Sequence, residues 1–321
     1  MIVPSFYSVK WYWNTDLTVK KNFKDTSTPG CDKTPQPHPL RPSRRWNRPG
    51  DWKPKSRATL PAALRSGYPD APSVADSVKS SGNSAMTTAM QESLKGEIGV
   101  LLFDQYGTVV DMQTGLVEAV TPFLRERGWQ GEPHRFVTWW RRTHYENSMI
   151  DALCDRGHTP YRLIGQRAVA QVMDRAGISY SQDDVVWLVG QIEALKPFPD
   201  VIEALERLSV RYKLAILSNG DRDMLDAAKP HIGFPFDQVI SVQEAGYFKP
   251  HWKTYAKAAE LLGEERARIL FVANHEFDCV GSKSYGMRAA FIDRRNRPFG
   301  AWPAQPDLVV ADFKSLADAL A

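Results

Sequence analysis

The sequence predicts an α/β protein with a doubly wound, Rossmann-like parallel sheet and an all-helical domain inserted after the first strand. The apolar run 98–103 is typical of a fully buried parallel strand, and it ends abruptly at Asp104. A carboxylate at the end of such a strand, followed by Gly107, stands where open α/β sheets bind their ligands. Strand and helix patterns alternate further along the chain, but a long helical stretch, 115–195, interrupts them.

Several helices are expected within this stretch. Apolar residues recur at helical spacing over 116–124, where Pro122 should lie in a first turn or at a kink. A second helix should run through the tryptophans and arginines of 139–142 to Tyr145. Two more are expected at 161–173 and 183–195.

The alternation resumes after a proline-containing linker at 197–200. Strands are expected where short apolar runs are bounded by polar residues, at 213–217, 238–242, 269–272, 289–292 and, at an edge, 307–310. Helices are expected at 201–208, 223–228 and 254–262.

Composition divides the chain near residue 95. Residues 1–95 hold 15 Lys and Arg against 7 Asp and Glu, together with 11 of the 22 prolines, and show no periodic apolar pattern. We expect them to form an irregular, disordered basic extension. Beyond it we expect an α/β core of residues 96–112 and 198–321 and a helical cap of residues 113–197.

The extension leaves three interpretations open. Its basic residues and scattered tryptophans suit binding to nucleic acid or an anionic membrane, but it carries no nucleic-acid motif and no signal-peptide order. It is otherwise a passive tail. The third interpretation is a mis-assigned start, because Met86 and Met90 lie just before the globular pattern begins.

The rest of the composition favours a soluble cytoplasmic protein. No apolar run approaches the roughly 18 residues that span a bilayer. The three cysteines, Cys31, Cys154 and Cys279, are widely spaced and follow no metal-ligand pattern. This usage suits a reducing compartment and argues against a disulfide scaffold or a zinc site.

Four short segments carry residues suited to chemistry, in the order Phe103–Thr108, Leu217–Gly220, Tyr247–Pro250 and Leu270–Asp278. They resemble the four ordered motifs of the haloacid dehalogenase superfamily. The similarity is closest to the L-2-haloacid dehalogenases (type II haloacid dehalogenases) and covers residues 97–321. It implies hydrolysis of 2-haloacids to 2-hydroxy acids through a covalent aspartyl intermediate.

The resemblance implies that Asp104 is the nucleophile that displaces the halide. A carboxylate suits this task because it is ionised at pH 7 and forms an ester that water can open. Lys249 and Asp278 match further catalytic positions, with Lys249 steadying the charge of Asp104. Thr108 should hydrogen-bond the nucleophile loop. The alternative for Lys249 and Asp278 is a surface ion pair.

Substrate binding is implied for Ser218 and Asn219, which should hold the carboxylate group together with backbone amides. Tyr106, Tyr255 and Asn274 match other substrate contacts. The alternatives are a simple turn for the Ser-Asn-Gly segment and a core aromatic for Tyr255.

Arg141 matches the arginine that the family places over the substrate to receive the departing halide. A guanidinium presents several donors in a fixed fork, which suits developing negative charge. The neighbouring Arg142 is equally basic, and either arginine otherwise lies on a solvated helix face.

One departure from the dehalogenase pattern affects the second step. His275 stands where the group commonly has an asparagine that places the hydrolytic water. The histidine serves as a general base or fills the same hydrogen-bonding space. Relatives that act on fluoroacetate or strained-ring acids therefore stay open as alternatives.

Two more functions compete with dehalogenation: a superfamily phosphatase acting on a small phosphate ester, and a non-enzymatic binding module. The phosphatases need an acid two residues after the nucleophile and a further acidic magnesium ligand, and this chain has Tyr106 and Asn274 there. A binding module should have lost Asp104 or Lys249, and both are present. We therefore expect no metal and no cofactor. The expected partners are a small 2-haloacid, water and, through the cap, a second copy in a homodimer.

Overall fold

The computed structural model describes residues 92–155 and 157–321. The interpretations of the N-terminal extension concern residues that, apart from 92–95, lie outside the described ranges. No helix in the described part of the chain has the length and apolar character needed to cross a membrane.

A six-stranded, fully parallel sheet forms the centre of the described structure, with the strand order β3-β2-β1-β4-β5-β6. Its strands are β1 (Val100–Phe103), β2 (Lys213–Ser218), β3 (Gln238–Ser241), β4 (Ile269–Ala273), β5 (Arg288–Ile292) and β6 (Leu308–Val310). The predicted α/β class and parallel sheet are thus confirmed. Because β1 pairs with β2 on one side and β4 on the other, Asp104 follows a strand in the middle of the sheet.

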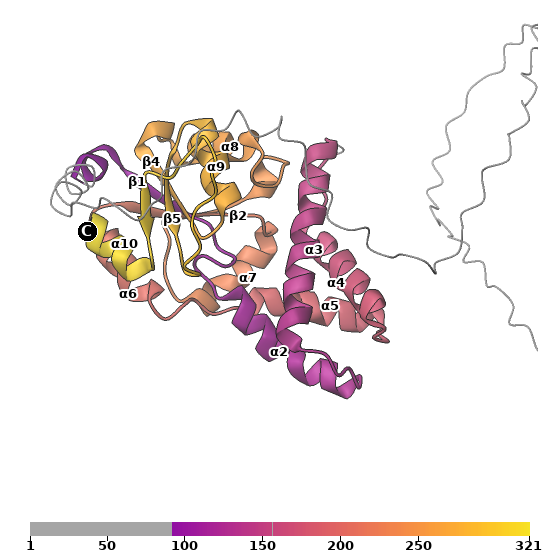
Figure 1. Cartoon of the computed structure of the whole chain (residues 1–321). Helices are drawn as coiled ribbons and strands as arrows, with labels where there is room; N and C mark the ends of the chain where they lie inside the picture. The colour runs from indigo at the N-terminus through magenta and orange to yellow at the C-terminus, as the bar shows by residue number, and fades with distance from the viewer. Residues whose placement is uncertain (1–91, 156) are drawn as a thin grey trace, which may run out of the picture. The chain divides into compact units, whose positions relative to one another are not determined.

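Helices cover both faces of this sheet (Figure 1). They are α6 (Val201–Ser209), α7 (Arg222–Ile232), α8 (Trp252–Leu262), α9 (Glu276–Tyr285) and α10 (Phe313–Leu320), with short 3-10 turns η3 (Val242–Glu244) and η4 (Arg266–Arg268). Helices α6 and α10 pack against each other, as do α8 and α9. Phe103 of β1 stacks on Phe313 of α10, whereas Phe271 of β4 meets Tyr255 of α8 edge to face.

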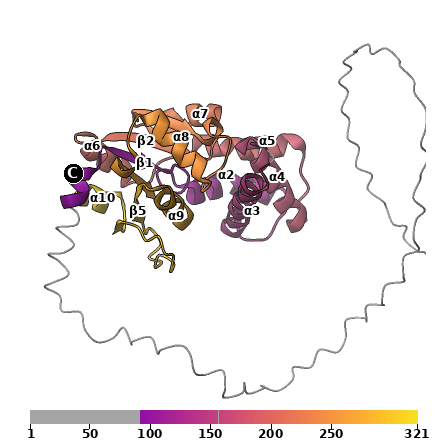
Figure 2. The same ribbon diagram turned by 90° about the horizontal axis from the view of Figure 1, so that it is seen from above.

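The helical stretch between β1 and α6 forms a group of its own (Figures 1 and 2). It consists of α2 (Met112–Glu126), α3 (Pro133–Cys154), α4 (Tyr161–Ala176), α5 (Gln182–Gly190) and η2 (Gln191–Ala194). Neighbouring helices in this group pack against one another. The chain enters and leaves the group through adjacent segments, because Asp111 N donates to Lys196 O and Phe198 N donates to Val109 O.

Three details of the helices differ from the sequence-based expectations or narrow them. The first inserted helix begins at Met112, where the Asp111 side chain caps the Thr114 amide. Pro122 lies in the interior of α2, which excludes the first turn, one of the two positions expected for it. Helices α9 and α10 were absent from the expected elements.

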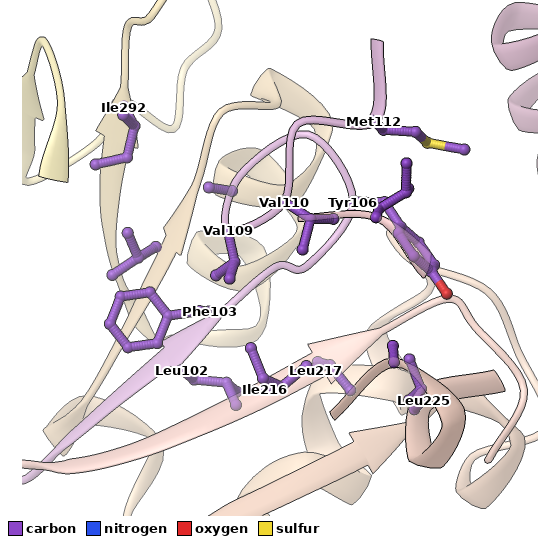
Figure 3. Packing of buried hydrophobic residues seen from close by; sticks show 14 of the residues in the cluster. Leu102, Phe103, Tyr106, Val109, Val110, Met112, Ile216, Leu217, Leu225 and Ile292 are labelled. Atoms are coloured by element: carbon purple, nitrogen blue, oxygen red, sulfur yellow. The ribbon is translucent and has the colours of Figure 1, made fainter. Parts of the chain in front are cut away.

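The loop after β1 is packed firmly onto the sheet. Val109 and Val110 are buried together with Phe103 and Ile216 (Figure 3). The Gln105 carbonyl accepts the amides of both valines, which closes a tight turn directly behind Asp104. The backbone that carries this carboxylate is therefore held on both sides by the core.

Candidate active site

Asp104 is the centre of a buried cluster of charged groups at the carboxyl end of β1. It is 5% exposed, and its two carboxylate oxygens have different donors. The Lys249 ammonium donates to Oδ1 at 2.7 Å, and the Thr108 hydroxyl donates to Oδ2 at 2.7 Å. Burial is the largest single influence and opposes ionisation of Asp104, but the charges and hydrogen bonds of Lys249 and His275 together outweigh it and lower the pKa of Asp104 below its usual value. The carboxylate is thus ionised and fixed in orientation.

Lys249 bridges two carboxylates. Its Nζ lies 2.7 Å from Asp104 Oδ1 and 3.1 Å from Asp278 Oδ2, and the lysine is almost fully buried. Burial disfavours its charge, but the two carboxylates raise its pKa above the ordinary value. The other oxygen of Asp278 accepts from the Tyr255 hydroxyl at 3.1 Å. Because all four side chains are buried, Lys249 and Asp278 do not form a surface ion pair.

Lys249 and Asp278, unlike Asp104, do not lie directly at the end of a strand. Lys249 follows β3 only after the η3 turn, and Asp278 lies in the first turn of α9. Burial raises the pKa of Asp278 to about 6, although the charge of Lys249 opposes the shift. The two carboxylates around one lysine therefore titrate in different pH ranges.

This raised pKa makes the contribution of Asp278 to stability depend on pH. The folded-state value lies above the ordinary 3.8, so the ionised form costs folding free energy. The stability of the fold with protonated Asp278 is therefore fully present below about pH 4 and is lost as the pH rises through 6 and the carboxylate ionises. Relative to wild type, Asp278→Asn should gain on the order of 2–3 kcal/mol of unfolding free energy between pH 4 and 8. Urea unfolding of both proteins across this range measures the change, and a pH-independent difference would contradict it.

His275 reaches Asp104 from the start of α9. Its Nδ1 lies 3.3 Å from Asp104 Oδ2, and its ring is partly exposed to the cavity above Asp104. Thr108 connects the two loops, because its hydroxyl oxygen also accepts the Asn274 amide at 2.9 Å. Gly107 permits the close approach. It has a φ of +90°, and a Cβ there would lie 3.1 Å from the His275 ring.

A cavity of about 670 Å³ opens above Asp104 and His275. Arg141 from α3 lines it and is half-buried, with Nη1 donating to Gln113 Oε1 at 2.8 Å. Tyr106 lines it as well, stacked on Tyr161 of α4 with ring centroids 5.7 Å apart. The cavity is thus bounded both by loops of the sheet and by the inserted helices.

Tyr106 is buried, and burial raises the pKa of its hydroxyl well above the ordinary value. Its ring points toward Leu225 (Figure 3). A Cβ on Gly220 would lie 2.8 Å from its hydroxyl oxygen, so only glycine fits there. The hydroxyl is itself buried and has no hydrogen-bond partner among the described residues.

The predicted site residues divide into two groups. Those that line the cavity are Asp104, Tyr106, Arg141, Asn219 and His275. Those that stand behind it are Thr108, Ser218, Lys249, Tyr255, Asn274 and Asp278.

The three of the second group that were expected to contact substrate are occupied within the protein. Ser218 is fully buried and accepts the Gly220 amide at 3.2 Å. Tyr255 donates to Asp278, and the Asn274 side chain donates to Ile292 O at 3.0 Å. In this structure they support the loops around Asp104 instead of facing the cavity. Asn219 lines the cavity and also supports a loop, since its Oδ1 accepts the Lys249 amide at 3.0 Å.

The neighbouring Arg141 and Arg142 differ in burial and in their acidic partners. Arg142 pairs with Glu146 at 2.7 Å, and its side chain is 77% exposed at the rim. Arg141 has no such partner within the described residues, and burial followed by the charge of Arg295 lowers its pKa. Both arginines line the cavity, and the choice of Arg141 over Arg142 stays a prediction.

Several residues that line the same cavity were not predicted from the sequence, namely Gln113, His134, Thr138, Tyr145, Tyr161, Phe277, Arg295 and Arg297. Most lie on the inserted helices, where a helical pattern does not reveal which face meets the sheet. The two arginines are an exception. They lie in the loop after the carboxyl end of β5, and a place after the carboxyl end of a parallel strand is the signal that identified Asp104.

Comparison with known proteins agrees with this geometry. The family model of haloacid dehalogenase-like hydrolases matches residues 98–283. The (S)-2-haloacid dehalogenase of Xanthobacter autotrophicus is 33% identical over 199 residues, which cover 61% of this chain and 76% of the relative.

Solved structures agree as well. The L-2-haloacid dehalogenase from Xanthobacter autotrophicus superposes with a TM-score of 0.64 at 29% identity, covering 69% of this chain and 97% of that chain. A second structure from this organism, with chloropropionic acid covalently bound, has a TM-score of 0.61 at 29% identity and the same coverage. The family match spans more than half of the chain and includes the loops that carry Asp104, Lys249 and Asp278. The resemblance found in the sequence is confirmed, and the chain belongs to the haloacid dehalogenase-like hydrolases.

Proposed function

We propose that this hydrolase cleaves the carbon–halogen bond of short L-2-haloacids and releases 2-hydroxy acids through an ester on Asp104. The observation that carries the proposal is the ionised Asp104, held by Lys249 and Thr108 beneath a cavity that Arg141 lines from the other side. Its (S)-2-haloacid dehalogenase relatives support the same reaction.

The reaction proceeds in two displacements. In the first, an oxygen of Asp104 forms a bond to C2 of the substrate, and the carbon–halogen bond breaks with its electron pair leaving on the halide. Arg141 stabilises the departing anion. Lys249 keeps the nucleophile charged and oriented, and Thr108 and Asp278 hold the arrangement.

In the second displacement, water attacks the carbonyl carbon of the ester. His275 accepts the proton of this water, because it lies beside Asp104 and also lines the cavity. The ester C–O bond breaks, the 2-hydroxy acid takes up a proton, and Asp104 is regenerated. Asn219, Tyr106 and backbone amides after Asp104 bind the substrate carboxylate.

The inserted helices act as a cap in this proposal, with residues 113–197 closing over a core of 96–112 and 198–321. Several cap residues, among them Arg141 and Tyr161, share the cavity with Asp104, which supports the assignment. We also propose a homodimer formed through the cap. Several large apolar side chains are exposed on its helices, among them Ile150, Leu153, Val186 and Trp187. A cytoplasmic location fits the free thiols of Cys154 and Cys279.

The phosphatase alternative requires a magnesium ion beside the nucleophile. Asp104, His275 and Asp278 do bring potential ligand atoms within 4.8 Å of one another. However, the Lys249 ammonium lies between the two carboxylates, and the Asn274 side chain is bound to Ile292 O. A dication would meet this positive charge, so the cluster does not fit magnesium despite its three potential ligands.

Halide release from a panel of acids tests the proposed function. We expect turnover of L-2-chloropropionate but not of its D enantiomer, unchanged by exhaustive treatment with EDTA. Fluoroacetate tests the range of halogens, and p-nitrophenyl phosphate tests the phosphatase branch. Activity on the phosphate ester that disappears with EDTA and returns with magnesium would overturn the proposal.

A further inference from the structure

The cavity above Asp104 holds more positive charge than a substrate with one carboxylate requires. Besides Arg141, it is lined by Arg295 and Arg297 from the loop that joins β5 to β6. These two arginines are exposed near the cavity opening. None of the three forms an ion pair with an acidic side chain within the described ranges, 92–155 and 157–321.

The acidic groups of the cavity do not balance this charge. Asp104 is the one carboxylate among the described residues that line it, and Lys249 behind it pairs with both Asp104 and Asp278. The rim arginine Arg142 is matched by Glu146. The cavity therefore carries a net positive field that favours anions, and a dianion more than a monoanion.

The arginines also act on one another. Burial lowers the pKa of Arg141, and the charge of Arg295 lowers it further. Burial lowers the pKa of Arg295, and Arg297 contributes in the same direction. Three cations that face one space, with Asp104 as the one carboxylate among its described lining residues, repel each other, so a bound anion would relieve this repulsion.

The dimensions of the site point the same way. A volume of about 670 Å³ lies in the range of pockets that hold drug-sized ligands, and a three-carbon acid fills only part of it. A second cavity of about 660 Å³ adjoins beyond Tyr145 and Phe277, whose rings lie 4.7 Å apart. Arg295 and Arg297 line both cavities, so the positive charge extends away from Asp104.

We propose that the preferred substrate is an L-2-haloacid with a second carboxylate at the far end of its side chain, a 2-halodicarboxylate. Its C2 lies over Asp104, and its distal carboxylate binds Arg295 and Arg297. Guanidinium groups suit this task because they bind carboxylates through two parallel hydrogen bonds. The inference rests on the proposed dehalogenation and specifies its substrate class.

The test compares substrates that differ only in the distal charge. The kcat/KM is measured for L-2-chloropropionate, L-2-chlorosuccinate and L-2-chloroglutarate, and for the distal amide of L-2-chloroglutarate as a neutral match. We expect at least one of the two dicarboxylates to exceed L-2-chloropropionate, and L-2-chloroglutarate to exceed its amide, each by about tenfold or more. Rising ionic strength should reduce the preference, because part of it acts through partly exposed arginines.

Variants locate the distal site. Arg295→Gln and Arg297→Gln should each lower kcat/KM for the preferred dicarboxylate by about tenfold, mainly through KM, and leave L-2-chloropropionate within about twofold. Arg175→Gln is the matched control, since Arg175 is an exposed arginine at the end of α4 that does not line either cavity. It should change neither substrate.

Two results would overturn the inference. Equal kcat/KM for L-2-chloroglutarate and its amide would mean that the distal charge does not contribute to substrate recognition. Equal losses for mono- and dicarboxylates in the arginine variants would mean that the arginines only attract anions in general. Either result with normal turnover of L-2-chloropropionate leaves the proposed function intact, whereas no halide release from any acid refutes both.

Discussion

Asp104→Asn is expected to lower the rate of halide release by more than three orders of magnitude, about 5 kcal/mol on the barrier. The amide is uncharged and a poor nucleophile, so the first displacement loses its attacking group. The shape of the side chain is kept, and Thr108 and Lys249 stay beside it. Halide release from L-2-chloropropionate measures the loss, and the thermal transition of the variant checks that the fold is intact.

An isotope experiment then separates two roles of Asp104. If its carboxylate attacks carbon, the oxygen added in the first turnover comes from the protein. A single turnover in heavy-oxygen water should give unlabelled 2-hydroxy acid, inverted at C2, with the label left in Asp104. Multiple turnovers in the same water should label the product and serve as the control. Solvent oxygen in the first-turnover product would show that water attacks directly and that Asp104 is at most a general base.

The sheet could be predicted closely because its strands are parallel and buried on both faces. Such strands are continuous apolar runs, and β2, β4 and β5 each lie within one residue of expectation. Helices α9 and α10 were not predicted. The segment of α9 carries the polar residues of the last motif, which obscure its helical apolar pattern. For Pro122 the sequence left a first turn and a kink open, and the structure places it in the interior of α2.

The site could be predicted in part. Motif positions located Asp104, Lys249 and Asp278, and the structure brings them within hydrogen-bonding distance. Motifs do not specify the direction of each side chain, which depends on contacts between distant segments. Tyr255 thus lies behind Asp278 instead of in the cavity, and Ser218 turns toward Gly220.

His275 shows what only the three-dimensional arrangement adds. Two ionisable groups beside Asp104, Lys249 and Asp278, are buried and do not line the cavity from which water must come. His275 is partly exposed there, with Nδ1 3.3 Å from Asp104 Oδ2. An imidazole can accept a proton near neutral pH, which a buried ammonium cannot do. This position supports the proposed role of His275 in the second displacement.

His275→Ala is expected to slow hydrolysis of the ester by about 10²–10⁴-fold while leaving its formation largely intact. One equivalent of halide should appear in a rapid burst, followed by slow turnover. Mass spectrometry should find the acid fragment attached to Asp104. His134→Ala is the matched control, because His134 lines the same cavity from α3, where no contact with Asp104 is seen among the described residues. It should show normal turnover and no trapped ester.

The alternative role of His275 predicts a different pattern. If the ring only fills space and holds a water molecule, His275→Gln should keep most of the activity, since an amide can also hydrogen-bond water but is a poor base. If the ring takes the proton, the glutamine variant should trap the ester as the alanine variant does. Loss of the halide burst itself in His275→Ala would contradict both, because it would place His275 in the first displacement beside the nucleophile.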